Sequence, residues 1–284
     1  MSEKLIFTNS KGQSITFGGA APYLLKKLEG TGAMDTDVQM HKTTFQDGQT
    51  WINTVLEPRT IAITISIMTR TQEELFQRRR ELSRVLNPKL GPGMLLYEYY
   101  GGTKEIEVVV EQPPVYPAGK DVKGYGYQEA MISFVCPSPF WRDISSVKEE
   151  IAAWGGLLEF PLEITPEGIE MGYREMSLIA NIFNPGDVPC GMRIRFKARA
   201  TVKNPSLFNV NTREELKINK TLDAGEVLTV TTHFANKRVE AEKQGVTESA
   251  FQWLDLDSTF LQLEPGDNLL RYNADEGIDN LEVD

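Results

Sequence analysis

The chain has 284 residues and a formal net charge of −10, and 40% of its residues are hydrophobic. That length allows two domains with buried cores. No apolar run approaches the ~20 residues that a membrane-spanning helix needs, and the first residues lack the basic and apolar regions of a signal peptide. We therefore expect synthesis in a cytoplasm and no insertion into a membrane.

The negative charge is concentrated in the second half of the chain. Residues 1–145 contain 16 Lys and Arg and 16 Asp and Glu, whereas residues 146–284 contain 14 and 24. An acidic domain repels phosphate groups, and a nucleic-acid-binding surface needs a basic patch. We therefore expect no direct nucleic-acid partner.

The chain begins with two candidate hairpins. The first pairs residues 5–7 with 15–17. In the second, residues 38–45 and 49–56 flank Asp47-Gly48, a dipeptide typical of a two-residue hairpin turn. Both hairpins predict antiparallel sheet near the N-terminus.

The surest strand and the one convincing helix follow each other directly. Residues 59–68 alternate strictly, with isoleucine at every second position, which predicts a strand. A helix is predicted over 71–86, because Thr71 and Glu74 form a capping box, leucines recur at helical spacing and Asn87-Pro88 ends the pattern. We expect the leucine face of the helix to pack on the isoleucine face of the strand.

Three consecutive arginines, residues 78–80, lie in this helix. Glu74 stands four residues before Arg78, and Glu73 and Glu81 are close, which favours a solvent-exposed face with helical ion pairs. Contact with a neighbour in a ring or with another partner is the alternative.

The rest of the first half is again β. Strands are predicted at 94–100 and 104–111, joined by Gly101-Gly102, with Pro113-Pro114 after the second strand. Another strand is predicted at 128–135, before a proline-rich stretch that ends at Trp141. We place the domain boundary at 141–150, which gives domains 1–145 and 146–284.

The second half repeats a strand–turn–strand unit. Turns are predicted at Asn184-Pro-Gly-Asp187, Asp223-Ala-Gly-Glu226 and Pro265-Gly266-Asp267-Asn268, the last inside a hairpin over residues 258–272. Repeated units of this kind predict an antiparallel β-sandwich. The candidate strands are 177–183, 191–202, 215–218, 227–232, 251–256, 259–263 and 268–273.

No constellation of residues points to catalysis, a cofactor or a metal. Cys136 and Cys190 are interpreted as buried reduced thiols, because disulfides are rare in a cytoplasm. His41 and His233 lie in different halves and are interpreted as strand residues. We predict no catalytic, cofactor-binding or metal-binding residues, and no enzymatic activity.

Two further patterns could serve chemistry or binding. Asp255 and Asp257 would share one face of a strand, opposite Leu254 and Leu256, and we interpret this pair, like Asp35 and Asp37, as a charged outer sheet face rather than a calcium or glycosidase site. The tryptophans could form a sugar platform but are interpreted as core or interface residues; they are Trp51, Trp141, Trp154 and Trp253.

The order of these features along the chain resembles the distal tail proteins of siphophages, which are baseplate hub subunits of long non-contractile tails. The resemblance spans nearly the whole chain. The features that carry it are Leu28-Glu29-Gly30, Asp47-Gly48, the strand opening at Arg59, the helix ending at Leu86-Asn87-Pro88, Gly93 to Tyr97, Pro137 to Trp141, Asn184 to Asp187, Asp223 to Glu226, and Ser258 to Tyr272.

The resemblance implies a mainly β protein, with an N-terminal ring-forming β domain that includes the helix and a long hairpin, and a C-terminal galectin-like antiparallel β-sandwich. It implies a homohexameric ring at the distal end of the tail of a virion or prophage particle. The implied partners are the tail tube protein, the tail-tip protein and receptor-binding components.

Three functions are therefore compared. The first is a structural hub of a phage tail tip. The second is a free-standing sugar-binding sandwich, suggested by the tryptophans and the galectin-like resemblance. The third is a glycosidase that uses surface carboxylates. The absence of a catalytic constellation and the neutral and acidic halves favour an assembly subunit, because closed rings need two different complementary surfaces on each subunit.

Overall fold

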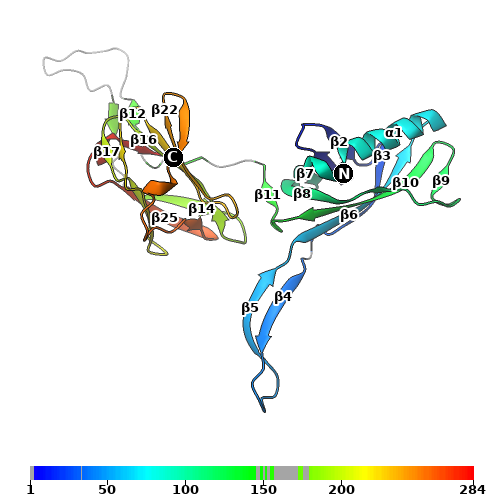
Figure 1. Cartoon of the computed structure of the whole chain (residues 1–284), viewed down its shortest axis with the longest axis horizontal. Helices are drawn as coiled ribbons and strands as arrows, with labels where there is room; N and C mark the ends of the chain where they lie inside the picture. Colours follow the sequence, from blue (N-terminus) through cyan, green and yellow to red (C-terminus); the bar gives the residue numbers. More distant parts are fainter. Residues whose placement is uncertain are drawn as a thin grey trace. The chain divides into compact units, whose positions relative to one another are not determined.

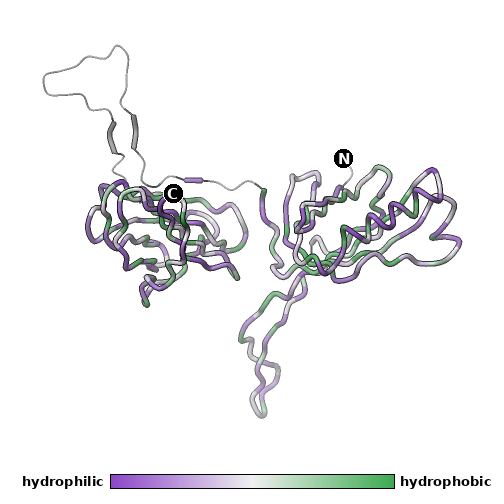
Figure 2. Tube along the Cα trace, turned by 45° about the horizontal axis from the view of Figure 1, so that its top comes forward, coloured by the Kyte–Doolittle hydropathy of each residue, from purple (hydrophilic) through white to green (hydrophobic). Residues whose placement is uncertain are grey.

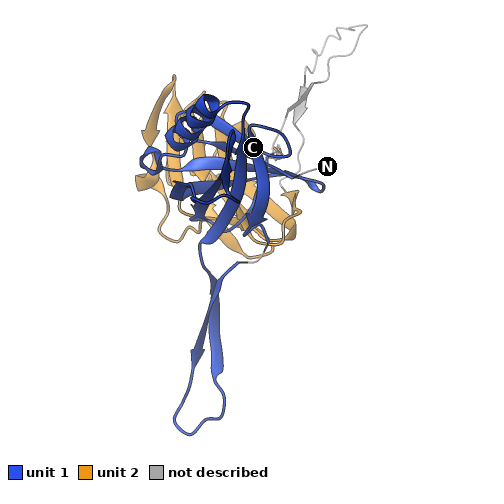
Figure 3. Cartoon of the chain, turned by 90° about the vertical axis from the view of Figure 1, so that its right-hand side faces the viewer, with its two compact units in different colours: residues 1–146 blue, residues 147–284 orange. Residues whose placement is uncertain are grey.

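The structure is a computed structural model that describes residues 3–32, 34–144, 148–149, 151, 154–156, 172–174 and 179–284. The chain divides into two compact units, which cover residues 1–146 and 147–284 (Figure 3). The described residues are mainly β with a single α-helix, as the sequence predicts. Among them, no helix is long and apolar enough to cross a membrane.

Eleven strands, one α-helix and one short 3₁₀ helix make up the first unit (Figure 1). The helices are α1 (Gln72–Val85) and η1 (Pro88–Leu90). The strands are β1 (Lys4–Thr8), β2 (Ser14–Phe17), β3 (Tyr23–Glu29), β4 (Thr36–His41), β5 (Thr50–Leu56), β6 (Arg59–Met68), β7 (Gly93–Tyr99), β8 (Gly102–Val115), β9 (Lys123–Gly124), β10 (Tyr127–Cys136) and β11 (Arg142–Asp143).

Antiparallel pairing joins most of these strands into one curled sheet. The strand order is β2-β1-β7-β8-β10-β6-β3, with β11 paired to β8 and β9 paired to β10. The two ends of this path meet, because Gly18 after β2 bridges to Leu24 in β3. The sheet therefore curls into an incomplete barrel around one core.

Strand β6 and helix α1 supply the centre of that core. The isoleucines predicted to share one face, Ile61, Ile63, Ile65 and Ile67, are all buried. Leu75, Leu82, Val85 and Leu86 of the helix segment belong to the same hydrophobic cluster. The predicted packing of the leucine face on the isoleucine face is confirmed.

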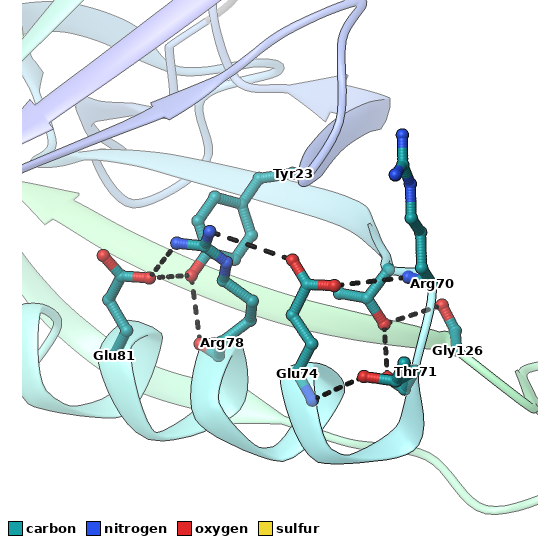
Figure 4. A network of polar contacts seen from close by, with 8 residues as sticks. Tyr23, Arg70, Thr71, Glu74, Arg78, Glu81 and Gly126 are labelled. Carbon is teal, nitrogen blue, oxygen red and sulfur yellow. Dashed lines mark hydrogen bonds and ion pairs between the residues drawn. The ribbon is translucent and has the colours of Figure 1, made fainter.

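The helix begins and ends where the sequence predicts. The Thr71 hydroxyl accepts a hydrogen bond from the Glu74 backbone N–H at 3.2 Å, and the Glu74 carboxylate accepts one from the backbone N–H of Arg70 at 3.3 Å (Figure 4). This arrangement satisfies free donors at the helix start. The Arg78 guanidinium donates to Glu81 at 2.9 Å, which confirms an ion-paired surface role for this first arginine of the run.

Tyr23 connects the helix to strand β3. Its hydroxyl donates to the Arg78 carbonyl and to the Glu81 carboxylate, each at 3.0 Å (Figure 4). Burial, together with the negative charge of Glu81, raises the pKa of Tyr23 above its ordinary value. The phenol therefore stays neutral and keeps its single proton, which the two acceptors share.

We expect the leucine face and the cap of α1 to differ strongly in their contribution to stability. Leu82→Ala should cost about 2–5 kcal/mol, because a fully buried side chain is lost and a cavity is left. Thr71→Ala should cost only about 1 kcal/mol through the lost cap. Hydrogen exchange of the full-length chain at increasing denaturant, measured on peptides from the first unit, compares the two. Equal costs would contradict the packing described here.

Two details of the first unit differ from the prediction, a turn and the end of a strand. The prediction of a two-residue turn at Asp47-Gly48 is wrong. Strand β4 ends at His41 and β5 begins at Thr50, so an eight-residue loop joins them. Strand β8 also does not end before Pro113-Pro114. The register between β10 and β8 shifts on either side of Ser133, and this irregularity accommodates prolines, which cannot donate to the sheet.

The second unit contains the remaining elements. The 3₁₀ helices are η2 (Phe251–Trp253) and η3 (Ile278–Asn280). The strands are β12 (Trp154–Gly156), β13 (Gly172–Arg174), β14 (Ile179–Asn184), β15 (Cys190–Gly191), β16 (Arg193–Ala198), β17 (Val202–Lys203), β18 (Ser206–Asn209), β19 (Glu214–Lys217), β20 (Thr221–Leu222), β21 (Val227–Thr231), β22 (Arg238–Lys243), β23 (Val246–Ser249), β24 (Gln262–Leu263), β25 (Gly266–Asn273) and β26 (Leu281–Val283).

Two antiparallel sheets form a sandwich in this unit. One has the order β14-β25-β18-β19 and the other β23-β22-β21-β16-β26. Inward residues of both sheets share one hydrophobic cluster, for example Leu207 and Tyr272 from the first sheet and Phe196 and Val230 from the second. The predicted antiparallel sandwich is confirmed.

The predicted hairpin over residues 258–272 is wrong. Strand β24 pairs with β15, whereas β25 pairs with β14 and β18, so the turn carries the chain between two sheets. The buried Asn268 side chain holds this corner: its amide donates to the Glu264 carbonyl at 2.7 Å, and its oxygen accepts from the Glu264 N–H at 2.9 Å. The predicted strand 251–256 is also wrong, because it begins with the 3₁₀ helix η2.

Candidate assembly surfaces

The hairpin of β4 and β5 extends away from the body of the first unit (Figures 1 and 3). Its strands pair only with each other. Every residue of both strands is exposed except Leu56, which is half-buried. A two-stranded hairpin without packing is marginally stable in water, so the unit itself stabilises this element only through the cross-strand pairing and its base.

The two faces of the hairpin differ in polarity. Cross-strand pairing puts Val38 opposite Thr54 and Met40 opposite Trp51 on one face, which we call the apolar face. A register shift lies next to Met40, and the Trp51 indole donates to the Thr54 hydroxyl at 2.9 Å on that face. Figure 2 shows hydrophobic residues along the length of the hairpin. Trp51 is 62% exposed, so a large apolar area remains in water.

Arg59 fixes the base of the hairpin. Its side chain is buried, and it donates to the carbonyls of Gly30 at 2.7 Å, Gly32 at 3.0 Å and Pro139 at 2.8 Å. Burial lowers the pKa of Arg59 from its ordinary value, and three carbonyl acceptors replace the lost hydration. One guanidinium thus connects the segment that enters the hairpin with the segment that leaves β10.

Two neighbouring contacts strengthen this connection. The Trp141 indole donates to the Thr31 carbonyl at 3.2 Å, so the same two segments are joined a second time. Gly30 has a φ of +88°, and a Cβ at this position would lie 1.9 Å from the Thr60 carbonyl oxygen. Only glycine permits this close approach to β6.

We expect Arg59→Met to loosen both segments together. The substitution keeps the buried volume but leaves three carbonyls without their donor, at a cost of about 3 kcal/mol. Amide exchange in the full-length chain should accelerate at residues 30–32 and at 139–141. Arg142→Met is the matched control, because Arg142 is exposed and lies 3.8 Å from Glu105, a surface pair of little energetic value. A response confined to one of the two segments would contradict the connection.

The outer faces of the sandwich differ from each other. On the five-stranded sheet, Arg195 and Lys197 of β16 lie beside Asp284, with the Lys197 ammonium 2.5 Å from its carboxylate. The outer face of the four-stranded sheet is mixed, because Asp267 and Arg271 of β25 point outward beside apolar side chains. Ile179 and Phe183 of β14 and Leu269 of β25 are exposed on it. Exposed apolar side chains rimmed by polar and charged residues are typical of a protein interface.

The residues considered for chemistry do not come together. His41 lies in the exposed hairpin of the first unit and His233 in the second unit. Cys136 is a buried thiol, as predicted, and burial raises its pKa to about 11. The prediction that Cys190 is buried is wrong, because it lies exposed in the two-residue strand β15. Both are free thiols.

Asp255 and Asp257 do not share a strand face. Asp255 accepts a hydrogen bond from the Asp257 backbone N–H at 3.0 Å, which makes a turn, and Leu256 at its tip is fully exposed. Asp35 and Asp37 are exposed at the hairpin, consistent with a charged outer face. No group of three or more potential metal ligands occurs within the part of the chain that the structure describes.

The described tryptophan side chains belong to three different parts of the fold. Trp51 is on the hairpin, Trp141 packs against the first core, and Trp253 packs against the second core with the Lys220 ammonium 4.6 Å from its ring centroid. The side chain of Trp154 lies outside the described residues. Trp141 and Trp253 thus pack against hydrophobic cores, in agreement with the core interpretation, whereas Trp51 is exposed.

The sequence matches two families of tail-protein domains. Residues 10–136 match the phage tail protein RIFT-related domain, and residues 185–283 match the C-terminal domain of the siphovirus-type tail component. Among curated proteins, none matches the sequence. The two domains define a siphovirus-type tail component. The chain belongs to the family of siphophage distal tail proteins.

Solved structures share the whole fold. The SPP1 Dit (gp 19.1) protein, described as a paradigm of the hub adsorption apparatus in phages that infect Gram-positive bacteria, is 13% identical, with a TM-score of 0.65 over 98% of this chain and 96% of that chain. A chain of the phage P2 baseplate in its Ca-activated conformation is 10% identical, with a TM-score of 0.57 over 100% and 97%. At these identities the likeness concerns the fold.

Proposed function

We propose that this protein is the hub subunit at the distal end of a siphophage tail, where six copies form a ring that joins the tail tube to the tail-tip protein. Family membership supports a structural role in the tail hub. The observation that carries the ring is the hairpin of β4 and β5, which exposes an apolar face that no described residue of the first unit covers. A neighbouring copy supplies that cover.

In this proposal the two units have separate roles. The first unit forms the ring, because it carries the hairpin and has equal numbers of basic and acidic residues in positions 1–145, so that copies packed around an axis do not repel each other. The second unit is a docking domain. The exposed apolar side chains on its four-stranded sheet suit the tail-tip protein or receptor-binding components, and the proposal requires no sugar-binding site there.

The apolar face can be tested on the full-length chain in solution. Trp51→Ser should weaken self-association by about 2 kcal/mol or more per contact, because exposed aromatic residues of this kind become hot spots when covered. It should leave the unfolding midpoint unchanged, since the Trp51 side chain lies on the exposed hairpin and belongs to neither hydrophobic core. Sedimentation velocity measures association, and thermal unfolding measures stability.

The control for this experiment is Phe234→Ser in the second unit, where the side chain is 91% exposed. It should leave association unchanged. If the Trp51 variant associates as strongly as the parent chain, the hairpin does not hold copies together. A parent chain that stays monomeric would contradict unaided ring formation.

A further inference from the structure

Helix α1 carries three arginines for which the described residues supply no carboxylate partner; we call them the arginine stripe, and they are Arg79, Arg80 and Arg84. Arg80 and Arg84 are exposed and lie four residues apart, so they face the same way. Neither forms an ion pair with any described residue, in contrast to Arg78. Like charges at this spacing destabilise a helix by a few tenths of a kcal/mol, although Arg84 also lies in the last turn, where the helix dipole favours a cation.

Aromatic rings hold one member of the stripe in place. The Arg79 guanidinium lies 4.0 Å from the ring centroid of Tyr116 and 5.6 Å from that of Phe76. Phe76 itself is 53% exposed. Stacking of this kind leaves the N–H donors of a guanidinium available at its edge for a carboxylate. An exposed aromatic residue among arginines is the composition that protein interfaces favour.

The hairpin has the complementary charge. Asp35, Asp37 and Glu57 are exposed near its base, on the face opposite Trp51, together with Val55, which pairs with Asp37; we call this the acidic face. Asp37 accepts a hydrogen bond from Gln39, but none of the three carboxylates forms an ion pair within the described part of the chain. Residues 34–58 contain four carboxylates and one cation, Lys42.

These two surfaces cannot meet within one copy. The helix packs against the curled sheet of the first unit, whereas the hairpin extends away from that sheet on its other side (Figure 3). Unpaired arginines and unpaired carboxylates at separate places on one subunit are the requirement for a head-to-tail contact. Such contacts close into a ring when their rotation allows it.

We propose that the acidic face of the hairpin of one copy docks on the arginine stripe of helix α1 of the next copy. The contact rests on the proposed ring and specifies which surfaces form it. The apolar face of the same hairpin remains free to contact another neighbouring copy. Charge complementarity across such a contact sets the order and orientation in which copies associate.

The test exchanges the charges in two separate full-length variants. Variant one is Arg80→Glu with Arg84→Glu, and variant two is Asp35→Arg with Asp37→Arg. Each alone places like charges across the contact and should weaken association by about tenfold or more. When the two variants are mixed and alternate around a ring, every contact again joins opposite charges. The mixture should therefore associate nearly as strongly as the parent chain in sedimentation velocity.

The control variant is Lys11→Glu, at an exposed position in the turn between β1 and β2, and it should change nothing. Unchanged unfolding midpoints show that each variant folds. If both variants associate like the parent, or if each is weakened and their mixture is not restored, this contact is wrong while the tail-hub function stands. A parent chain that stays monomeric overturns the contact as well. The tail-hub function is then tested separately, by asking whether phage particles contain this protein at the tail end.

Discussion

Burial of the isoleucine row on β6 is the constraint on which the first unit depends. Ile61 to Ile67 point into the core, and this fixes the register of β6 against β10 along all ten residues and against β3 on its other side. A slip by one residue would turn every isoleucine to water. Helix α1 then has one apolar surface on which to place its leucines.

The same register places the hairpin. Arg59 is the first residue of β6, so its position follows from that of the isoleucines. From there its guanidinium reaches the carbonyls of Gly30, Gly32 and Pro139. The exposed hairpin is therefore attached to the most firmly packed strand of the unit. A projecting element needs such a base if it is to present its surfaces to a neighbour in a constant orientation.

Local patterns in the sequence predicted the elements that are stabilised locally. The alternation of residues 59–68 and the capped helix after it were readable because periodicity and caps act within a few residues. The corner at residues 263–268 was not readable in the same way. Pro265 and Gly266 reveal a turn, but whether the flanking strands pair depends on distant partners, here β15 for β24 and β14 for β25.

The assembly surfaces were only partly predictable. The sequence showed three arginines in the helix, and Glu74 and Glu81 suggested ion pairs for them. Of these three arginines, the two carboxylates pair only with Arg78. The exposure of Trp51 and Met40 could not be read, because an alternating strand looks the same whether its apolar face meets a core or water. Arg59 is a single charged residue at the start of an alternating apolar strand. This could have indicated a buried, hydrogen-bonded side chain, but an analysis of periodicity does not use it.

The measurement that tests the central claim most directly is electron cryomicroscopy of the tail end of particles that carry this protein. The account predicts six copies in one closed ring at the distal end of the tail tube, with the hairpin of each copy against its neighbour. A tail end without this protein, or a ring whose hairpins extend into solvent without contacting another copy, would contradict it.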